Sequence, residues 1–297
     1  MHRGRPAWIV LGIGFLLLIS IVAGVLVVGR GGKSSGSPRP LAVLRTADYH
    51  SLAFSPDDPN VVFFGHHNGV MRSDDGGKTW RRLVERRNFD AMALAIAGGD
   101  SRLVYLAGHD VFYVSHDGGV SWRPVEHNLP GTDIHGFTIS PETHGLYAFV
   151  VGHGLFHSSD GGRIWAMVST QLPTDVVDIA ANGGNPELLY AVSLRMGVLR
   201  STDGGQHWVP VSALGSGAVA AVEVDLRAPK TVYAGGQSGL YTSTDAGDSW
   251  TRLAFPRNSV TVLASSPSQP GLLLAIVAHG DEGFVYRSED GGRTWER

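Results

Sequence analysis

The chain has 297 residues, of which 43% are hydrophobic and 17% charged, and it contains 40 glycines and no cysteine. The lack of cysteine excludes disulfides and thiolate metal sites, and the glycine content favours a turn-rich β protein over a helical bundle. All five charged residues among the first 39 are basic, so the remainder carries 19 basic against 27 acidic residues. An acidic body argues against nucleic acid as a partner, because phosphate contacts need clustered lysine and arginine.

Residues 1–29 are predicted to form a short cytoplasmic stub and a transmembrane anchor at about 8–28. The segment from Trp8 to Val28 is uncharged and, as a helix, would span roughly 30 Å, the hydrocarbon thickness of a bilayer. A cleaved signal peptide is the alternative, but its apolar region is normally about 7–15 residues long and ends in a small-x-small site, which is absent here. We expect a single-pass protein of the cell membrane with an extracytoplasmic domain, because a large domain after a short N-terminal tail is usually exported.

Residues 30–40 are predicted to form a Gly/Ser linker that stiffens at its proline end. Six segments with the pattern Ser-x-Asp-x-Gly-x-x-Trp follow, and we call each a box. Their aspartates are 42 to 45 residues apart. The defining residues are Ser73, Asp75, Gly77 and Trp80; Ser115, Asp117, Gly119 and Trp122; Ser158, Asp160, Gly162 and Trp165; Ser201, Asp203, Gly205 and Trp208; Ser243, Asp245, Gly247 and Trp250; and Ser288, Asp290, Gly292 and Trp295. Apolar runs around each box indicate four strands per repeat, so residues 41–297 are predicted to be an all-β, six-bladed β-propeller of four-stranded blades.

The composition of the box is typical of a tight turn between the third and fourth strands. We expect the aspartate to accept a hydrogen bond from a backbone N–H two residues on, and the serine hydroxyl to add a second local bond. The glycine of the pattern fits a position with positive φ. The fifth box has Ala246 where the others have a further glycine, so that position is expected not to need positive φ. The tryptophan is expected to pack between blades.

Leu41–Arg45 falls in the register of an outer strand. We predict that this segment pairs with the sixth blade and closes the ring, which also removes an exposed strand edge.

The face opposite the boxes is expected to collect the inter-blade links and the turns between second and third strands. We place the ligand there. The candidates are His50, His66, His67, His109, Asp110, His135, His153, Asp175, Arg195, His279 and Asp281. A glycosidase carboxylate pair could be drawn from Asp48, Asp90, Asp133, Asp175 or Asp281, although solvated turn residues are the simpler interpretation.

Histidines are concentrated on this face. Such imidazoles could bind Zn²⁺ or Cu²⁺ or titrate with pH. However, turns on adjacent blades are expected to lie ~10 Å or more apart, while one ion needs its nitrogens at about 2.0–2.1 Å. A shared site would need the turns to converge near the channel, so the sequence assigns no metal and no cofactor.

The repeated motif resembles the Asp-box, or bacterial neuraminidase repeat, over residues 41–297. Families with this motif include sialidases, xyloglucan-cleaving glycosidases, the sortilin ectodomain and a photosystem II assembly factor; bacterial membrane-anchored Asp-box proteins, loosely labelled glycosyl hydrolases, are closest in layout. The resemblance implies a propeller whose boxes lie at the blade periphery, away from active sites. The Arg-Ile-Pro signature of sialidases is absent, and most arginines lie beside the boxes. The acidic body and six boxes also differ from the assembly factor, which is described with seven blades and a basic patch.

These observations predict a membrane-anchored binding or scaffold module for a protein, peptide or glycan rather than an enzyme. A glycoside hydrolase, sialidase-like or using another carboxylate pair, is the alternative.

Overall fold

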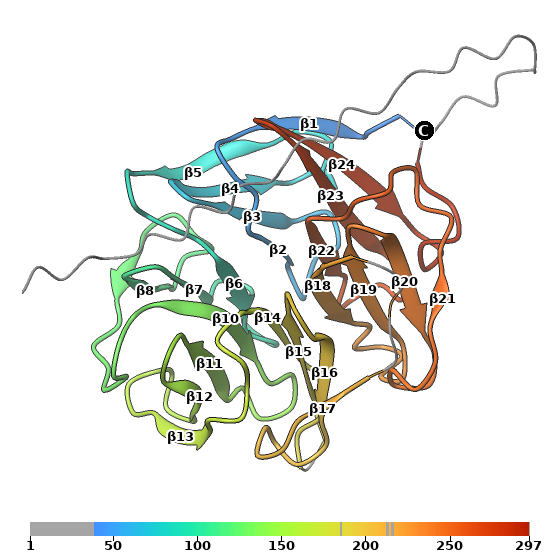
Figure 1. Ribbon diagram of the computed structural model, residues 1–297. Coiled ribbons are helices and arrows are strands. Elements are labelled where there is room, and N and C mark those ends of the chain that lie inside the picture. The colour runs from blue at the N-terminus through green and yellow to red at the C-terminus, as the bar shows by residue number, and fades with distance from the viewer. Residues whose placement is uncertain (1–38, 185, 212–213, 215–216, 297) are drawn as a thin grey trace, which may run out of the picture. The chain divides into compact units, whose positions relative to one another are not determined.

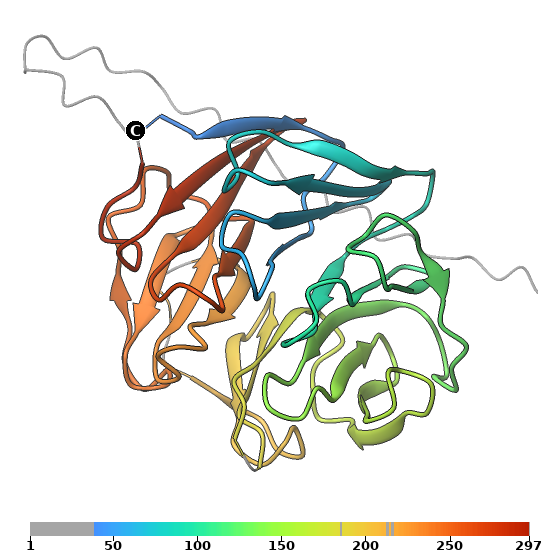
Figure 2. The ribbon, with the colours of Figure 1, turned by 180° about the vertical axis from the view of Figure 1, so that it is seen from behind.

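A computed structural model describes residues 39–184, 186–211, 214 and 217–296, and this part of the chain forms six four-stranded antiparallel sheets. The sheets are arranged as blades around a central channel (Figures 1 and 2). The predicted all-β, six-bladed propeller is therefore confirmed. Within the described residues no helix is long and apolar enough to cross a membrane, and the anchor expected at 8–28 lies outside them.

Five blades consist of four strands that follow one another in the chain. They are β2 Ser51–Phe54, β3 Val62–His66, β4 Gly69–Ser73 and β5 Arg81–Glu85; β6 Ala93–Ile96, β7 Val104–Gly108, β8 Val111–Ser115 and β9 Arg123–Pro124; β10 Ile134–Ile139, β11 Leu146–Val150, β12 Gly154–Ser158 and β13 Ala166–Ser169; β14 Val176–Ala181, β15 Leu189–Ser193, β16 Gly197–Ser201 and β17 Val209–Pro210; and β18 Val219–Val224, β19 Val232–Gly236, β20 Gly239–Ser243 and β21 Thr251–Arg252. The first strand of each blade lines the channel and the fourth lies outermost.

The sixth blade is assembled from both ends of the propeller. It contains β22 Val262–Ser265, β23 Leu273–His279 and β24 Glu282–Ser288, and its outer strand is β1 Ala42–Arg45. Ala42 lies opposite Val285 in an antiparallel ladder, and Leu44 is buried. The predicted closure of the ring by the segment after the linker is confirmed.

Hydrophobic packing holds neighbouring blades together. Each of six buried clusters combines residues of two adjacent blades, as expected when both faces of every sheet are covered. In one of them, Phe112 of β8 meets Trp165 of the next blade in an edge-to-face contact with ring centroids 5.9 Å apart. The box tryptophans thus pack between blades, as predicted.

Each box forms the turn between the third and fourth strands of its blade. In the third box, Ser158 Oγ donates to Asp160 Oδ1 at 2.8 Å and accepts from Gly162 N at 3.0 Å, and Asp160 Oδ1 accepts from Ile164 N at 2.9 Å. The indole N–H of Trp165 donates to the carbonyl of Gly162. The aspartate therefore accepts from backbone N–H groups three and four residues on, not two as the sequence predicts, because Gly161 and Gly162, both with positive φ, turn the chain back toward the carboxylate.

The position of Ala246 corrects a second expectation. Ala246 has φ of 59°, and the glycine at the same position in the other boxes also has positive φ, as at Gly204 with 74°. The position does require the left-handed conformation, and alanine occupies it despite its Cβ. The following glycine, Gly247 in this box, has positive φ as predicted.

Backbone bonds define two faces of the ring. On one face the boxes contact the loops between first and second strands, for example through Gly118 N and the carbonyl of Arg102 at 3.0 Å. On the other, links between blades contact the turns between second and third strands, for example through Ala91 N and the carbonyl of His66 at 3.2 Å. The boxes therefore lie on one face of the ring, and the links and the turns between second and third strands lie on the other, as expected.

Candidate functional site

A cluster of histidines and aspartates lies on the face opposite the boxes, where the links lead into the inner strands. We call it the histidine–aspartate cluster. It comprises Asp48, His50, His67, Asp90, His109, Asp133 and His135. It draws residues from the first three blades and their links, and His50 also lines the channel.

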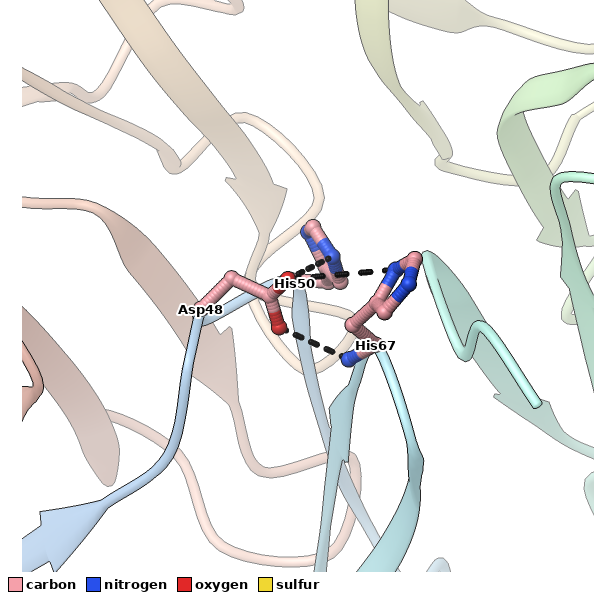
Figure 3. Close-up of side chains that lie close together, drawn as sticks. All are labelled: Asp48, His50 and His67. Carbon is pink, nitrogen blue, oxygen red and sulfur yellow. Dashed lines mark hydrogen bonds and ion pairs between the residues drawn. The ribbon is translucent and has the colours of Figure 1, made fainter. Parts of the chain in front are cut away.

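The first half of the cluster is formed by the link into the first blade and by the β3–β4 turn of that blade (Figure 3). Asp48 accepts a hydrogen bond from the backbone N–H of His67 at 2.7 Å, which fixes the link against the β3–β4 turn. His50 Nε2 is 3.4 Å from Asp48 Oδ2 and 3.3 Å from Asp90 Oδ1. Two carboxylates from different blades therefore flank one imidazole.

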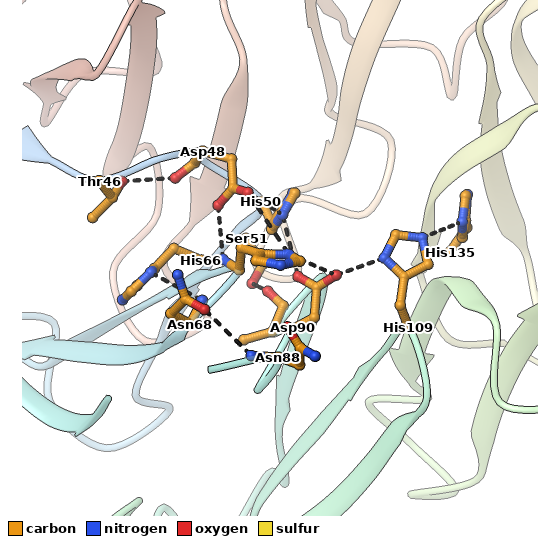
Figure 4. A network of polar contacts seen from close by, with 12 residues as sticks. Thr46, Asp48, His50, Ser51, His66, Asn68, Asn88, Asp90, His109 and His135 are labelled. Atoms are coloured by element: carbon orange, nitrogen blue, oxygen red, sulfur yellow. Dashed lines mark hydrogen bonds and ion pairs between the residues drawn. The ribbon is translucent and has the colours of Figure 1, made fainter. Parts of the chain in front are cut away.

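The second half continues from Asp90 to the third blade (Figure 4). His109 Nδ1 is 2.5 Å from Asp90 Oδ2, and His109 Nε2 is 3.0 Å from His135 Nε2. Asp133 Oδ1 lies 3.1 Å from His135 Nε2 and 3.4 Å from His109 Nε2. Asp90 is thus the central residue of the cluster.

Asp90 is 1% exposed, yet it is held as an anion. Burial raises the pKa of its carboxyl, but the contacts with His109 and His50 outweigh burial and hold the pKa well below its usual range. For His50, burial lowers the pKa, but Asp48 and Asp90 outweigh that effect and raise it to about 9. The hydrogen bond from His109 to Asp90 raises the pKa of His109, whereas burial lowers that of His135.

Two further carboxyls lie deeper, where the inner strands enclose a cavity of about 180 Å³. Asp178 accepts from the backbone N–H of Val222 at 2.9 Å, and Glu223 accepts from that of Ser265 at 3.2 Å. Burial raises the pKa of Asp178 to about 6 and that of Glu223 to about 8. Both carboxyls therefore favour the protonated form more than ordinary surface acids do.

Only four of the predicted ligand-face residues meet in the cluster: His50, His67, His109 and His135. The others lie elsewhere. His66 is buried beside a hollow of about 360 Å³, and Asp175 pairs with Arg195 at 2.8 Å. The remaining four are exposed and lie in, or directly before, the turns between second and third strands: Asp110, His153, His279 and Asp281.

The aspartates of the cluster are expected from the sequence only as link carboxylates, not as partners of histidines. A signal for them exists: Asp48, Asp90, Asp133 and Asp175 occupy the same place in successive repeats. In the first and third repeats that aspartate stands two residues before a histidine, at His50 and His135. Asp133 and His135 stand at the start of β10, where residues i and i+2 share a face, and Asp48 and His50 repeat that spacing in the link before β2.

Comparison with known proteins identifies BNR/Asp-box repeats at residues 71–82 and 113–124, the first two boxes. A curated relative, a probable oligoxyloglucan-reducing end-specific xyloglucanase of Neosartorya fischeri, is 33% identical over 90 residues, which are 28% of this chain and 11% of the relative. The chain therefore matches a small part of that protein's length.

Solved structures share the fold at lower identity. The GH74 xyloglucanase of Xanthomonas campestris aligns with a TM-score of 0.62 and 19% identity, over 86% of this chain and 46% of the xyloglucanase chain. YCF48 of Cyanidioschyzon merolae aligns with a TM-score of 0.56 and 18% identity, over 88% of each chain. A further structure shows YCF48 bound to D1 peptide. At these identities the likeness shows the fold alone.

Proposed function

We propose that this chain is a membrane-tethered binding propeller that presents the face opposite its Asp-boxes to a peptide or protein. Residues 8–28 anchor it in the cell membrane, and residues 41–297 lie on the extracytoplasmic side. The histidine–aspartate cluster carries the proposal, because it gathers charged and hydrogen-bonding side chains of three blades at the channel mouth. Convergent polar groups at such a mouth orient a ligand.

The charge states of the cluster favour binding over glycoside hydrolysis. A glycosidase needs one carboxylic acid whose pKa is raised, so that it can protonate the leaving oxygen. The pKa of Asp90 is lowered by His109 and His50 against the effect of burial, and the pKa of Asp48 is lowered by His50 and His67. Both are anions that accept hydrogen bonds, which suits recognition of a cationic or N–H-rich ligand.

A solved structure of the same fold supports the same proposal. The described propeller aligns with 88% of the YCF48 chain, and a further structure shows YCF48 bound to D1 peptide.

Peptide and glycan arrays probed with the purified full chain in detergent test the proposal. We expect selective capture of peptides without cleavage. A variant with two carboxylates of the cluster neutralised should lose capture: Asp48→Asn and Asp133→Asn. The matched control neutralises two exposed carboxylates on the box face: Asp100→Asn and Glu142→Gln. Equal binding by both variants would contradict the assignment of the face.

Placement in the membrane is tested by fractionation of cells that produce the chain. The full chain should remain with membranes after an alkaline wash and be digested by protease added outside the cytoplasmic membrane. A chain without residues 1–40 should be released by the wash. A protease-protected full chain would contradict the proposed orientation.

A glycoside hydrolase is the alternative, and the channel carboxyls are the observation that favours it. The raised pKa of Glu223, about 8 because of burial, is the property required of a general acid. Release of reducing sugar from xyloglucan or other glycans, abolished in Glu223→Gln, would replace the binding proposal by this one.

A further inference from the structure

Three ligand-type atoms from two blades converge at the outer part of the histidine–aspartate cluster. They are His109 Nε2, Asp133 Oδ1 and His135 Nε2. His135 Nε2 lies 3.0 Å from His109 Nε2 and 3.1 Å from Asp133 Oδ1, and the latter two atoms are 3.4 Å apart. In a tetrahedral zinc site with bonds of about 2.0–2.1 Å, ligand atoms are about 3.3–3.4 Å apart. Shifts of a few tenths of an ångström would therefore place all three on one ion.

The hydrogen-bond chemistry of the three atoms also favours a cation between them. His109 Nδ1 lies 2.5 Å from Oδ2 of the buried Asp90, and an Nδ1–H donated there leaves the lone pair of Nε2 directed toward His135 and Asp133. His135 Nε2 can supply at most one proton to these two acceptors. A metal ion satisfies all three atoms at once.

Asp90 occupies the place that carboxylates take behind metal-binding histidines. Such a carboxylate accepts the remaining ring N–H, fixes the tautomer and orients the ring. The backbone adds rigidity: His109 and Asp133 form a β-bridge, and Asp110 N donates to the carbonyl of Thr132 at 3.0 Å. The ligands are therefore held by paired backbone segments rather than by a free loop.

We propose that His109, His135 and Asp133 bind one Zn²⁺ ion, with Asp90 orienting His109. The side chains of His109 and Asp133 are 47% and 50% exposed, so the ion can enter from solvent and the fourth position is open to water. Two imidazoles and one carboxylate suit Zn²⁺. They do not suit Ca²⁺ or Mg²⁺, because these ions prefer oxygen ligands alone. This inference does not depend on the proposed binding function.

The other half of the cluster fits one ion less well. His67 Nδ1 lies 3.9 Å from Asp48 Oδ2, and the backbone N–H of His67 already donates to the other oxygen of Asp48. His50 is instead flanked by Asp48 and Asp90, which makes it an ion-pair partner of both carboxylates. His67 therefore serves as a control residue.

Calorimetric titration of the chelator-treated full chain with ZnCl₂ at pH 7 tests the site. We expect one ion per chain with a dissociation constant below about 10 μM, no heat with MgCl₂, and a tetrahedral visible spectrum when CoCl₂ replaces zinc. His109→Gln and His135→Gln should abolish binding, and both positions are partly exposed, so both variants should fold. Asp90→Asn should weaken binding about 10- to 100-fold while the stoichiometry stays one.

His67→Gln and His153→Gln are the matched controls and should bind like the parent chain. Weaker binding than about 10 μM by the parent, or equal binding by His109→Gln, His135→Gln and the parent, would overturn the proposal and leave a hydrogen-bonded imidazole pair. Loss of binding in His67→Gln with retention in His135→Gln would likewise overturn it, because the ion would then lie at Asp48 and His50. Circular dichroism of each variant verifies that it is folded.

Discussion

Ala246 is the one residue at its position in the six boxes that carries a side chain, and its φ of 59° lies in the left-handed region. That conformation costs an L-residue with a Cβ roughly 1–2 kcal/mol. Ala246→Gly should therefore raise the free energy of unfolding by about 0.5–1 kcal/mol, less than the full cost because glycine loses more entropy on folding. Denaturant titration measures the change.

The reverse substitution, glycine to alanine, can be made at Gly204, which occupies the same position in the fourth box. A Cβ placed there would meet no atom within 4 Å, so Gly204→Ala changes the backbone preference alone. It should destabilise the chain by about 1 kcal/mol. A neutral outcome for both substitutions would show that the turn relaxes around alanine.

Ser158 is 1% exposed and satisfies two partners at once, the carboxylate of Asp160 and the backbone N–H of Gly162. Ser158→Ala leaves that buried N–H without an acceptor, so it should destabilise the chain by about 1–3 kcal/mol. Asp160→Ala should also lower the melting temperature, and neither change should alter ligand affinity of the folded fraction. Lost binding at an unchanged melting temperature would mean that the box is part of a ligand site.

The control for Ser158 is Ser121, a serine whose hydroxyl also bonds a box aspartate but lies at the surface. Ser121 donates to Asp117 Oδ2 at 2.6 Å and is exposed. Because water can replace that bond, Ser121→Ala should change stability by less than about 0.5 kcal/mol.

Strand β1 is the element on which ring closure depends. Deletion of residues 41–46 removes its whole ladder with β24 and the buried side chain of Leu44, and it exposes a strand edge. We expect a sharp fall in melting temperature by calorimetry. Deletion of six linker residues, 31–36, should leave the melting temperature unchanged, and a parent-like melt of the 41–46 deletion would contradict this role for β1.

The strands and turns of each blade were predictable from the sequence because every repeat carries the same box and the same apolar runs. The box fixes the turn before the fourth strand, and the spacing of 42 to 45 residues sets the number of blades. The register of Leu41–Arg45 even identifies the closing strand. The conformation at Ala246 was not predictable in the same way: a single alanine among glycines argues against positive φ, but the fixed path of the turn overrides the preference of the residue.

The cluster was predictable only in part, because it depends on how blades are juxtaposed. The sequence places His50, His109 and His135 on one face. Which side chains meet is decided by the ring: Asp90 of one link contacts His109 of its own blade and His50 of the previous one. A period of 42 or 43 residues carries no information about such distances.

At the scale of the whole molecule, Glu223 links stability to pH. Burial raises the pKa of its carboxyl to about 8, with smaller contributions from Asp178 and Asp225, from an ordinary value of 4.5. Between these values the native chain holds a proton that the unfolded chain releases, so this group makes stability fall as pH rises. The contribution is complete below pH 4.5 and lost above about pH 8.

Glu223→Gln removes this linkage, so the melting temperature of the variant should fall less than that of the parent between pH 5 and pH 8. Calorimetric melts across that range measure the difference. Glu142→Gln, at an exposed glutamate, should follow the parent curve. Parallel curves for all three proteins would show that Glu223 is ionised in the native chain.

The way the sixth blade is assembled has a consequence for biosynthesis. Ala42 of β1 leaves the ribosome early, but its partner Val285 follows more than 240 residues later. At about 5–20 residues per second, β1 waits roughly 12–50 s for β24. During that time five blades can form in order while the ring stays open. A nascent chain stalled before residue 282 therefore leaves β1 without its partner strand and the apolar faces of the first and fifth blades uncovered, and such surfaces are prone to join another copy.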